Sequence, residues 1–195
     1  MEVTSRFQDQ FTKLHLWTLD KDGYDWVFYM DSDVLVVRSL VPMFQHVLLA
    51  DVPSSTPTLW VARDFPSFPE TFNMGMFAVQ PNSTEFERLM CLLHNKYTNN
   101  SSNNCSAVEF QEGWMEQGFL NAVYRESWNE LQWVYAMNMD TWGHRRDVWD
   151  ANATGIQAIH CTLMKPWNAW CPWTQYAPLC YLFWHRDEML FHRVY

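Results

Sequence analysis

The sequence contains little positive charge, and this scarcity excludes one large class of partners. Among its 195 residues there are 13 Lys and Arg but 22 Asp and Glu, which gives a formal net charge of −9. A protein that binds a nucleic acid needs a basic surface for the phosphate backbone, and no such surface is evident here. We therefore expect no nucleic-acid partner.

Long apolar runs and a signal peptide are also missing. No stretch approaches the ~20 apolar residues that span a bilayer, and no signal peptide opens the chain. We expect no membrane span in this chain. The protein is then either cytosolic or made with a targeting segment that this sequence does not contain.

The five cysteines form no C-x-x-C pair, so they predict no zinc site, and their odd number leaves disulfide pairing open. Five N-x-[ST] sequons favour the lumen of the secretory pathway. They begin at Asn82, Asn99, Asn100, Asn104 and Asn152. We expect a Golgi lumen location, with a longer form associated with the membrane, and the cytoplasm as the alternative.

Apolar residues are plentiful, which predicts a folded chain. Hydrophobic residues make up 48% and charged residues 18% of the sequence. The length suits one domain over residues 1–195. Residues 95–107 are polar, rich in Asn and without periodicity, so we expect an exposed loop there.

Helices are predicted where apolar residues recur at helical spacing. Residues 4–19 form one amphipathic helix with Thr4 as its cap, and residues 83–93 form another, capped by Ser83 or Asn82. The apolar face of the second comprises Phe86, Leu89, Met90 and Leu93. Shorter helices are expected from Pro42, from about Met115 and over residues 177–188.

Short apolar runs predict strands at residues 58–62, 76–79, 133–139 and 156–160. Asn73 and Gly75 stand just before the second of these runs. A glycine in such a place marks either a tight turn or a close approach of the backbone, and the tight turn is the default.

The most informative stretch is the apolar run Val27–Met30, which ends in Asp31-Ser32-Asp33. Such a run is typical of a strand buried on both faces of a parallel sheet. Ligands bind beyond the carboxyl ends of such strands, where the two aspartates would stand. Two carboxylates can share a hard divalent cation that leaves places for phosphate oxygens. An Asp-x-Asp sequence alone is also common in solvated turns.

Five blocks of the sequence, taken in order, resemble glycosyltransferase family 8, the retaining glycosyltransferases of the glycogenin, plant glucuronosyltransferase and galactinol synthase group. The blocks are residues 12–17, 28–36, 72–77, 116–121 and 160–167. This resemblance implies an α/β chain of the GT-A type, a Rossmann-like and mainly parallel sheet flanked by helices.

The resemblance also implies a metal and a donor substrate. Asp31, Asp33 and His160 would bind Mn²⁺ or Mg²⁺, and the ion would hold the diphosphate of a UDP-sugar. Residues that would contact the donor are Lys13, Asp31, Ser32, Asp33, Gly75 and Lys165. Those near the reacting sugar would be Asn73, Glu116 and Gln117. No protein nucleophile is required, so Glu116 is not assigned as one.

The implied activity is transfer of a hexose or uronic acid from the UDP-sugar to a glycan or glycoprotein acceptor. Three positions depart from the family pattern: Glu116 replaces Asp, Leu163 replaces a Gly, and Met74 replaces a small Ser. The family also has strand units upstream of the helix that bears Lys13, so we expect the domain to be incomplete at its N-terminal end, which would leave an apolar sheet edge exposed.

Two other functions fit parts of the sequence. A catalytically inactive relative, acting as a partner subunit or carbohydrate binder, is favoured by Leu163, by Glu116 and by the missing N-terminal part. A haloacid-dehalogenase-type phosphatase would use Asp31 as nucleophile, but such enzymes carry Thr where Leu35 stands and a later Gly-Asp, which this sequence lacks. Donor sugar, acceptor and oligomeric state cannot be predicted from the sequence.

Overall fold

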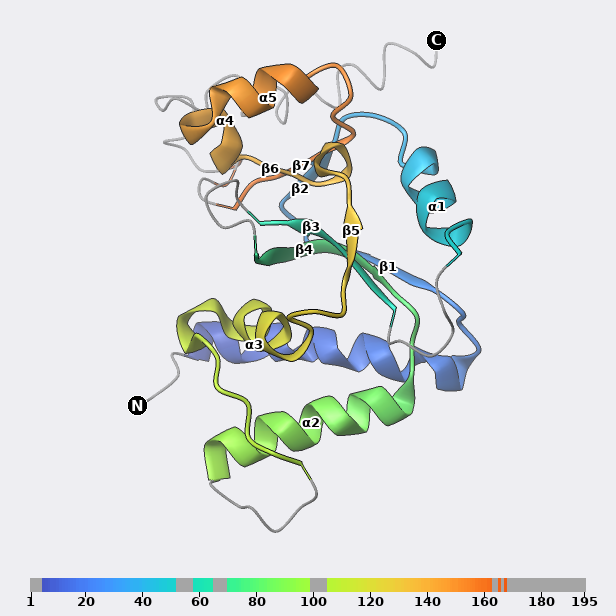
Figure 1. Ribbon diagram of the computed structural model, residues 1–195, viewed down its shortest axis with the longest axis vertical. Coiled ribbons are helices and arrows are strands. Elements are labelled where there is room, and N and C mark those ends of the chain that lie inside the picture. Colours follow the sequence, from blue (N-terminus) through green and yellow to red (C-terminus); the bar gives the residue numbers. More distant parts are fainter. Residues whose placement is uncertain are drawn as a thin grey trace.

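The computed structural model describes residues 5–51, 58–64, 70–98, 105–162, 165 and 167. Figure 1 shows the molecule as stacked layers, with α2 at one end, then η1 and α3, then a four-stranded sheet, then a smaller sheet beneath α4 and α5. The expected helix at residues 177–188 lies outside the described residues. Within them, no helix is long and apolar enough to cross a membrane.

The larger sheet has the strand order β1-β4-β3-β5. Its strands are β1 (Val27–Met30), β3 (Leu59–Arg63), β4 (Phe72–Val79) and β5 (Asn129–Leu131). β4 runs antiparallel to both β1 and β3, and only β5 runs parallel to its neighbour β3.

The prediction of a mainly parallel sheet was therefore wrong for the described strands. The link from Arg63 to Phe72 is shorter than the roughly dozen residues that a crossover to a parallel strand needs, so the chain turns back on itself. β1 is half-buried, because it is the outer strand of this sheet in the described part of the chain. The apolar sequence of β4 reflects cover on both faces rather than strand direction.

The smaller sheet has the order β2-β7-β6. Its strands are β2 (Val34–Val36), β6 (Met137–Asn138) and β7 (Ala158–His160). β2 pairs antiparallel with β7, and β6 pairs parallel with β7. Because β2 follows Asp33 directly and β7 ends at His160, this sheet brings both ends of the candidate site together.

Helices surround the two sheets. They are η1 (Ser5–Asp22), α1 (Val41–Leu48), α2 (Ser83–Thr98), η2 (Glu112–Trp114), α3 (Met115–Val123), η3 (Trp133–Tyr135), α4 (Asp140–His144) and α5 (Arg146–Asn152). Pro42 lies in the first turn of α1, and α3 begins at Met115, as predicted. The stretch expected as a strand at residues 133–139 is divided between η3 and β6.

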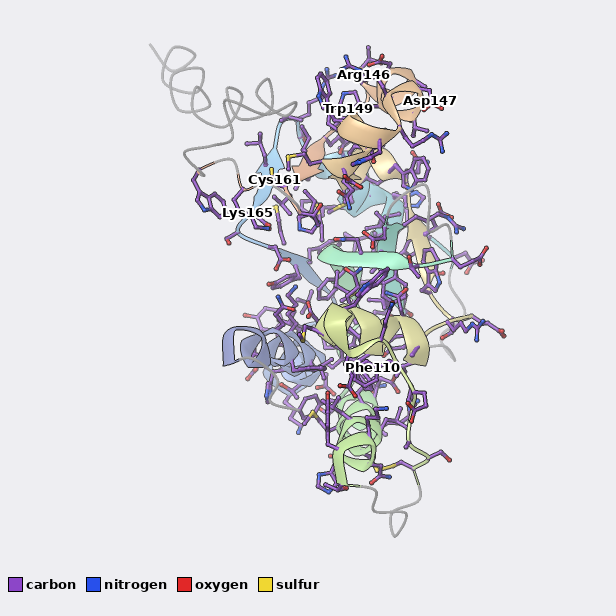
Figure 2. The ribbon with its side chains drawn as sticks, turned by 90° about the vertical axis from the view of Figure 1, so that its left-hand side faces the viewer. Phe110, Arg146, Asp147, Trp149, Cys161 and Lys165 are labelled. Carbon is purple, nitrogen blue, oxygen red and sulfur yellow. A yellow bond between two sulfur atoms is a disulfide. The ribbon has the colours of Figure 1, made fainter. Side chains whose placement is uncertain are left out.

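The core is divided by the larger sheet into two apolar clusters. On one face, side chains of β3 and β4 pack against η1, α2 and α3; on the other, they pack against α1 and the smaller sheet. A third cluster lies between the smaller sheet and α5, where Trp149 is buried. Figure 2 shows Trp149 near one end of the molecule and Phe110 beside α3 toward the other.

Two predictions about α2 need correction. The helix continues to Thr98 and Asn95 is buried, so the expected loop at 95–107 does not begin at residue 95. Met90 is 39% exposed, whereas Leu92 is buried in its place, because the helix turns a slightly different face to η1. The cap is Asn82, whose side-chain oxygen accepts the Glu85 N–H at 3.0 Å.

β4 is longer than predicted and irregular near its start. Val61 pairs with Phe77 but Arg63 pairs with Phe72, so β4 holds extra residues between these pairs. Asn73 and Gly75 lie in this irregular stretch, inside the strand rather than in a turn before it. Irregularities of this kind redirect side chains, and here they bring β4 to the edge of a cavity.

Candidate functional site

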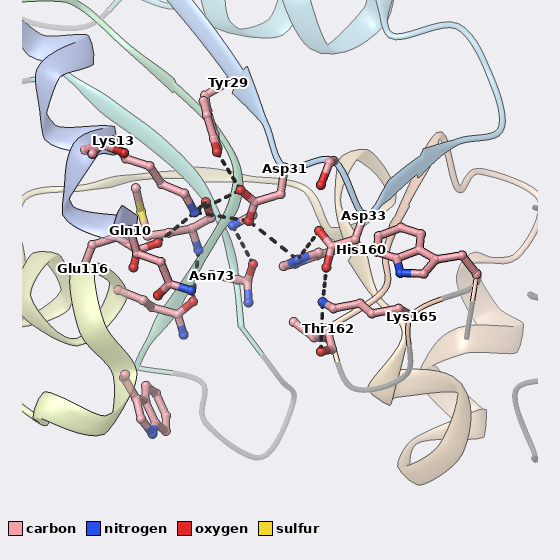
Figure 3. Close-up of a pocket in the computed structure, with 17 residues that line it drawn as sticks. Gln10, Lys13, Tyr29, Asp31, Asp33, Asn73, Glu116, His160, Thr162 and Lys165 are labelled. Atoms are coloured by element: carbon pink, nitrogen blue, oxygen red, sulfur yellow. Dashed lines mark hydrogen bonds and ion pairs between the residues drawn. The ribbon is translucent and has the colours of Figure 1, made fainter. Parts of the chain in front are cut away.

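A cavity of about 490 Å³ opens where β1, β4, α3 and β7 meet η1. Every residue proposed from the sequence for the site lines it: Lys13, Asp31, Ser32, Asp33, Asn73, Gly75, Glu116, Gln117, His160 and Lys165. Figure 3 shows these side chains converging from both sheets and from the flanking helices. The structure therefore brings them together, while their individual roles stay predictions.

The Asp31-Ser32-Asp33 segment is the tight link from β1 to β2. The Asp31 N–H donates to the carbonyl of Gly75 at 2.8 Å, and the Asp33 carbonyl accepts the N–H of Cys161 at 3.0 Å. Asp31 is thus fixed to β4, and Asp33 is fixed to the residue that follows β7. Asp33 is buried and Asp31 is half-buried, as expected for carboxylates that face a cavity.

Asp31, Asp33 and His160 form a cluster that suits a divalent cation. One ligand atom from each lies within 4.8 Å of the others. His160 Nε2 is 3.5 Å from Asp33 Oδ1 and 4.0 Å from Asp31 Oδ2. Ligand atoms that are each about 2.1 Å from one ion lie at most about 4.2 Å apart, so small movements are enough. Two carboxylates and an imidazole are suitable ligands for Mn²⁺ or Mg²⁺.

Gly75 makes room for the His160 ring. A Cβ on Gly75 would lie 2.5 Å from His160 Nε2, which is closer than side-chain atoms approach each other. The glycine therefore marks a close approach, and the default interpretation as a tight turn was wrong. The physical cause is the irregularity in β4, which brings its backbone against β7.

Lys165 places a positive charge beside the cluster. Its Nζ donates to Asp33 Oδ2 and to the carbonyl of Cys161, the latter at 3.0 Å. Burial by itself raises the pKa of Asp33, but hydrogen bonds from His160 and Lys165 outweigh it and hold this pKa well below its usual range. Asp33 is therefore an anion at neutral pH, the state in which it can bind a cation.

Lys13 joins the opposite wall of the cavity. Its Nζ donates to Glu116 Oε1 at 2.8 Å, to Asp31 Oδ2 at 3.1 Å and to the Met74 carbonyl at 3.3 Å. Tyr29, which the sequence analysis missed, donates its hydroxyl to Asp31 Oδ1 at 2.7 Å. The Lys13 side chain is only 9% exposed, so it is a buried part of the cavity wall rather than a solvated helix residue.

Glu116 is the buried acid of the site. Its Oε2 is buried and has no hydrogen-bond partner among the described residues. Burial raises the pKa of Glu116; attraction to Lys13 opposes this effect, and the Asp31 carboxylate adds to it. A hydroxyl group of a ligand could donate to Oε2, because an unpaired buried oxygen is costly.

Asp64, at the end of β3, contacts side-chain amide groups from three elements. It accepts hydrogen bonds from Asn73 Nδ2 at 2.9 Å, Gln117 Nε2 at 3.0 Å and Asn138 Nδ2 at 3.2 Å. Gln117 in turn accepts the Met74 N–H at 3.1 Å. Asp64 was not selected from the sequence. The sequence feature that could have identified Asp64 as a site residue is its position at the end of a predicted strand, next to Arg63.

The three departures from the family pattern have different positions. The Met74 side chain is buried in the core beside η1 and α3, and only its backbone is tied to Lys13 and Gln117. Glu116 reaches Lys13 across the cavity. Leu163 lies outside the described residues.

Comparison with curated proteins finds glycosyltransferases, although no protein family model matches the chain. Glycogenin-1 of Mus musculus is 26% identical over 164 residues, which cover 80% of this chain and 41% of that protein. UDP-glucuronate:xylan alpha-glucuronosyltransferase 2 of Arabidopsis thaliana is 21% identical over 173 residues, covering 85% of this chain and 24% of that protein. The chain spans less than half the length of the curated relatives it matches.

Solved structures with the same fold are also glycosyltransferases. The apo form of GlyE from Streptococcus pneumoniae TIGR4 matches with a TM-score of 0.56 at 18% identity, over 83% of this chain and 39% of that chain. An active-site mutant of LgtC matches with a TM-score of 0.56 at 18% identity, over 87% of this chain and 65% of that chain. The predicted α/β fold class of the GT-A type is confirmed. The chain is thus similar in sequence to the glycogenins and to a plant glucuronosyltransferase, and it has the GT-A fold of glycosyltransferases.

Proposed function

We propose that this chain is a metal-dependent, retaining glycosyltransferase that moves a hexose or uronic acid from a UDP-sugar to a glycan or glycoprotein acceptor. The observation that carries the proposal is the cluster of Asp31, Asp33 and His160 inside the cavity. One relative is named for glucuronosyl transfer, and the solved structures with the same fold are glycosyltransferases, which supports the same class of reaction.

Local charge makes the cavity suitable for a diphosphate. The chain carries a net charge of −9, so an anionic donor needs local cations to bind. Lys13 and Lys165 supply them from opposite walls, each hydrogen-bonded to an aspartate of the cluster. Asp31, Asp33 and His160 would hold Mn²⁺ or Mg²⁺, which when bound stabilises the negative charge on a departing UDP.

The residues around the cluster would position the sugar. The bond between the anomeric carbon and the diphosphate oxygen breaks, and the electron pair leaves with UDP. The acceptor hydroxyl oxygen bonds to the same carbon on the same face, and its proton passes to an oxygen of the departing phosphate. Glu116 and Gln117, held by Lys13 and Asp64, would hydrogen-bond the transferred sugar. The protein then acts by orienting two substrates and excluding water.

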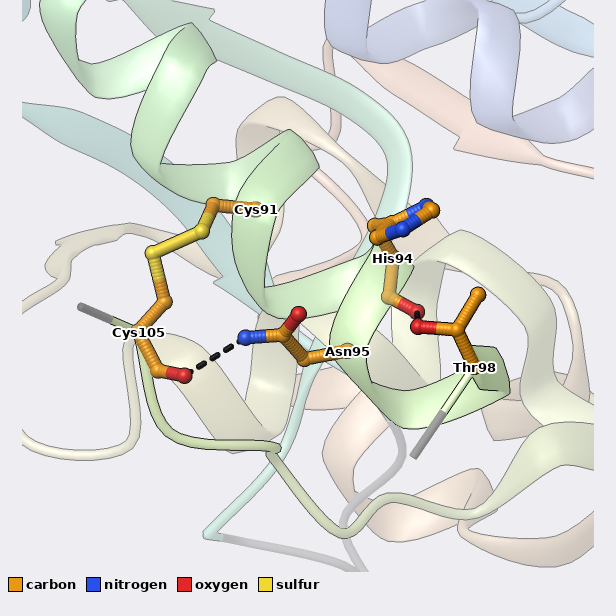
Figure 4. Close-up of a disulfide and its surroundings, with 5 residues drawn as sticks. All are labelled: Cys91, His94, Asn95, Thr98 and Cys105. Atoms are coloured by element: carbon orange, nitrogen blue, oxygen red, sulfur yellow. Dashed lines mark hydrogen bonds between the residues drawn. A yellow bond between two sulfur atoms is a disulfide. The ribbon is translucent and has the colours of Figure 1, made fainter. Parts of the chain in front are cut away.

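We further propose a location in the secretory pathway, with the Golgi lumen as the compartment. Cys91 and Cys105 form a disulfide, shown in Figure 4, and disulfides persist in oxidising compartments. The five sequons in the sequence agree with this location.

Calorimetric titration of UDP tests the proposed site. We expect UDP to bind in the presence of Mn²⁺ and much more weakly in its absence. Asp33→Asn keeps the size of the side chain and removes its charge, so metal-dependent binding should fall at least 10- to 100-fold, roughly the loss seen when even an outer partner of a metal ligand is changed. Asp150→Asn, at an exposed ion pair with Arg146, is the matched control and should bind like the parent.

Transfer is measured next with a panel of UDP-hexoses and UDP-uronic acids. Release of UDP that depends on Mn²⁺ and on an added glycan would support a transferase. Binding that needs the metal, without any release of UDP, would mark an inactive relative. A folded protein that binds UDP equally well without a metal, or does not bind it at all, would refute the proposal.

A further inference from the structure

Asn82 stands at the junction of β4 and α2, in the sequon Asn82-Ser83-Thr84. The residue is exposed. Its side-chain oxygen Oδ1 caps α2 by accepting the Glu85 N–H, and its backbone carbonyl accepts the Phe86 N–H, each at 3.0 Å. Both acceptor groups are therefore occupied by the helix, while Nδ2 has no hydrogen-bond partner among the described residues.

The other sequon in the described part of the chain is arranged differently. Asn152 is the last residue of α5, where it is half-buried. Its Nδ2 donates to the Val148 carbonyl at 2.8 Å, back along the same helix. A sugar on this nitrogen would have to displace that bond or lie against α5. The two sequons thus differ at the one atom that the modification uses.

We propose that Asn82 carries an N-linked glycan and that Asn152 does not, or does so in only a minority of molecules. The Asn82 amide nitrogen bonds to the anomeric carbon of a lipid-diphosphate-linked oligosaccharide. The bond from that carbon to the diphosphate oxygen breaks, the lipid diphosphate leaves with the electron pair, and the nitrogen loses one proton. Oδ1 is unchanged, so the cap of α2 survives the modification.

The position of Asn82 keeps a glycan away from the cavity. β4 begins beside the cavity and leads to α2 at its other end (Figure 1). At about 3.3 Å per residue, the strand from Asn73 to Val79 alone spans roughly 20 Å. A glycan at Asn82 would therefore cover the start of α2 and the end of η1, where Asp20 accepts the Ser83 N–H at 2.9 Å.

N-glycosylation also requires that the chain enters the lumen of the secretory pathway, and a separate observation supports that location. The disulfide between Cys91 and Cys105 belongs to an oxidising compartment, where N-glycosylation also takes place. The inference rests on the luminal location proposed above and not on the transfer reaction. A chain without transferase activity would still be modified at Asn82.

The test is to express the full chain behind a heterologous signal peptide in eukaryotic cells. Glycans are removed with peptide N-glycosidase F in heavy-oxygen water, which labels each site that carried one, and the peptides are read by mass spectrometry. We expect the label on Asn82 in the majority of molecules and on Asn152 in a minority. Protein retained in the endoplasmic reticulum is analysed in the same way, so occupancy is read whether or not the chain is secreted.

Two variants remove the sequon without removing the cap. Asn82→Asp keeps an oxygen that accepts the Glu85 N–H, and Thr84→Ala leaves Asn82 in place. Each should lose the label at position 82 completely, and the label at Asn152 should not change. Metal-dependent binding of UDP should stay the same in both variants. An unlabelled Asn82 in a disulfide-bonded chain, or equal labelling of both sites, would overturn the inference.

Discussion

Gly75 contributes to the site because it has no Cβ and so leaves room for the His160 ring. Any Cβ at this position would collide with the His160 ring, which the proposed metal site needs at its present place. We expect Gly75→Ala to displace the ring and to lower metal-dependent affinity for UDP about 10- to 100-fold, as loss of correct ligand orientation does. The unfolding free energy should fall by about 1–3 kcal/mol, the usual effect of overpacking. Titration calorimetry and urea unfolding measure the two effects.

Gly113→Ala is the control for this substitution. No atom lies within 4 Å of a Cβ built there, and its backbone is not in the left-handed region. Its affinity for UDP should equal that of the parent. Parent-like affinity in Gly75→Ala would show that the His160 ring can move without harm, and the role assigned to Gly75 would then be wrong.

The pKa of Glu116 links this residue to the pH dependence of stability. Burial raises this pKa above its ordinary value of 4.5. A carboxyl with a raised folded-state pKa contributes its full stability below the unfolded pKa, and that contribution is lost as the pH rises through the folded pKa. The ionised side chain is therefore disfavoured in the folded protein at neutral pH.

Glu116→Gln removes this titration while keeping the shape of the side chain. We expect the unfolding free energy of the variant, relative to the parent, to increase as the pH rises from about 4 to about 7. Urea unfolding at several pH values in that range gives the difference. Glu130→Gln, in an exposed ion pair with Arg63, controls for the replacement of a carboxylate by an amide. A difference that stays constant with pH in Glu116→Gln would contradict the assigned shift.

At the scale of elements, the disulfide joins the middle of α2 to the segment that leads into η2. Cys91 lies in α2, and Cys105 begins a stretch whose Val108 and Phe110 pack against the helical core. The Asn95 side chain adds a hydrogen bond to the Cys105 carbonyl at 2.6 Å, visible in Figure 4. The bridge and this hydrogen bond therefore both tie Cys105 to α2.

Removing the bridge should destabilise the fold. The two cysteines are 14 positions apart, and closing a loop of that length contributes about 3 kcal/mol. We expect Cys91→Ser/Cys105→Ser to lower the unfolding free energy by about this amount in urea. The reduced parent should match the double variant, and a reducing agent should have no effect on the variant. Equal stability of the oxidised parent and the variant would contradict this assignment.

At the scale of the whole molecule, Asp64 connects the two sheets. Asn73 belongs to the larger sheet, Asn138 to the smaller one and Gln117 to α3, and all three amides donate to the Asp64 carboxylate. The cavity lies at this junction. Its shape therefore depends on a carboxylate that contributes no atom to the lining.

Asp64→Asn should loosen this junction. Asn has only one acceptor oxygen and places an amide group where three other amides already donate. We expect a loss of about 2 kcal/mol in unfolding free energy, within the range for hydrogen bonds to a charged group, together with weaker binding of UDP. Urea unfolding and calorimetry measure both, with Asp150→Asn as the exposed control. Parent-like values for both would show that the three amides are held without Asp64.

The sequence by itself determined the features that depend on neighbours along the chain. The α/β class, the carboxylates after β1, the start of α3 at Met115 and the ordered blocks of family resemblance are local patterns of apolar and polar residues. Such patterns predict elements well, because each element forms from contiguous residues.

Only the tertiary structure decided features that depend on distant residues. The antiparallel pairing of β1 with β4, the choice of Cys91 and Cys105 among five cysteines, the approach of Gly75 to His160 and the amides around Asp64 all join segments far apart in the sequence. A hydrophobic pattern along the chain specifies neither the direction of a strand in a sheet nor the segment against which an element packs. Which groups meet is decided by how the layers pack, since packing is a property of the whole fold.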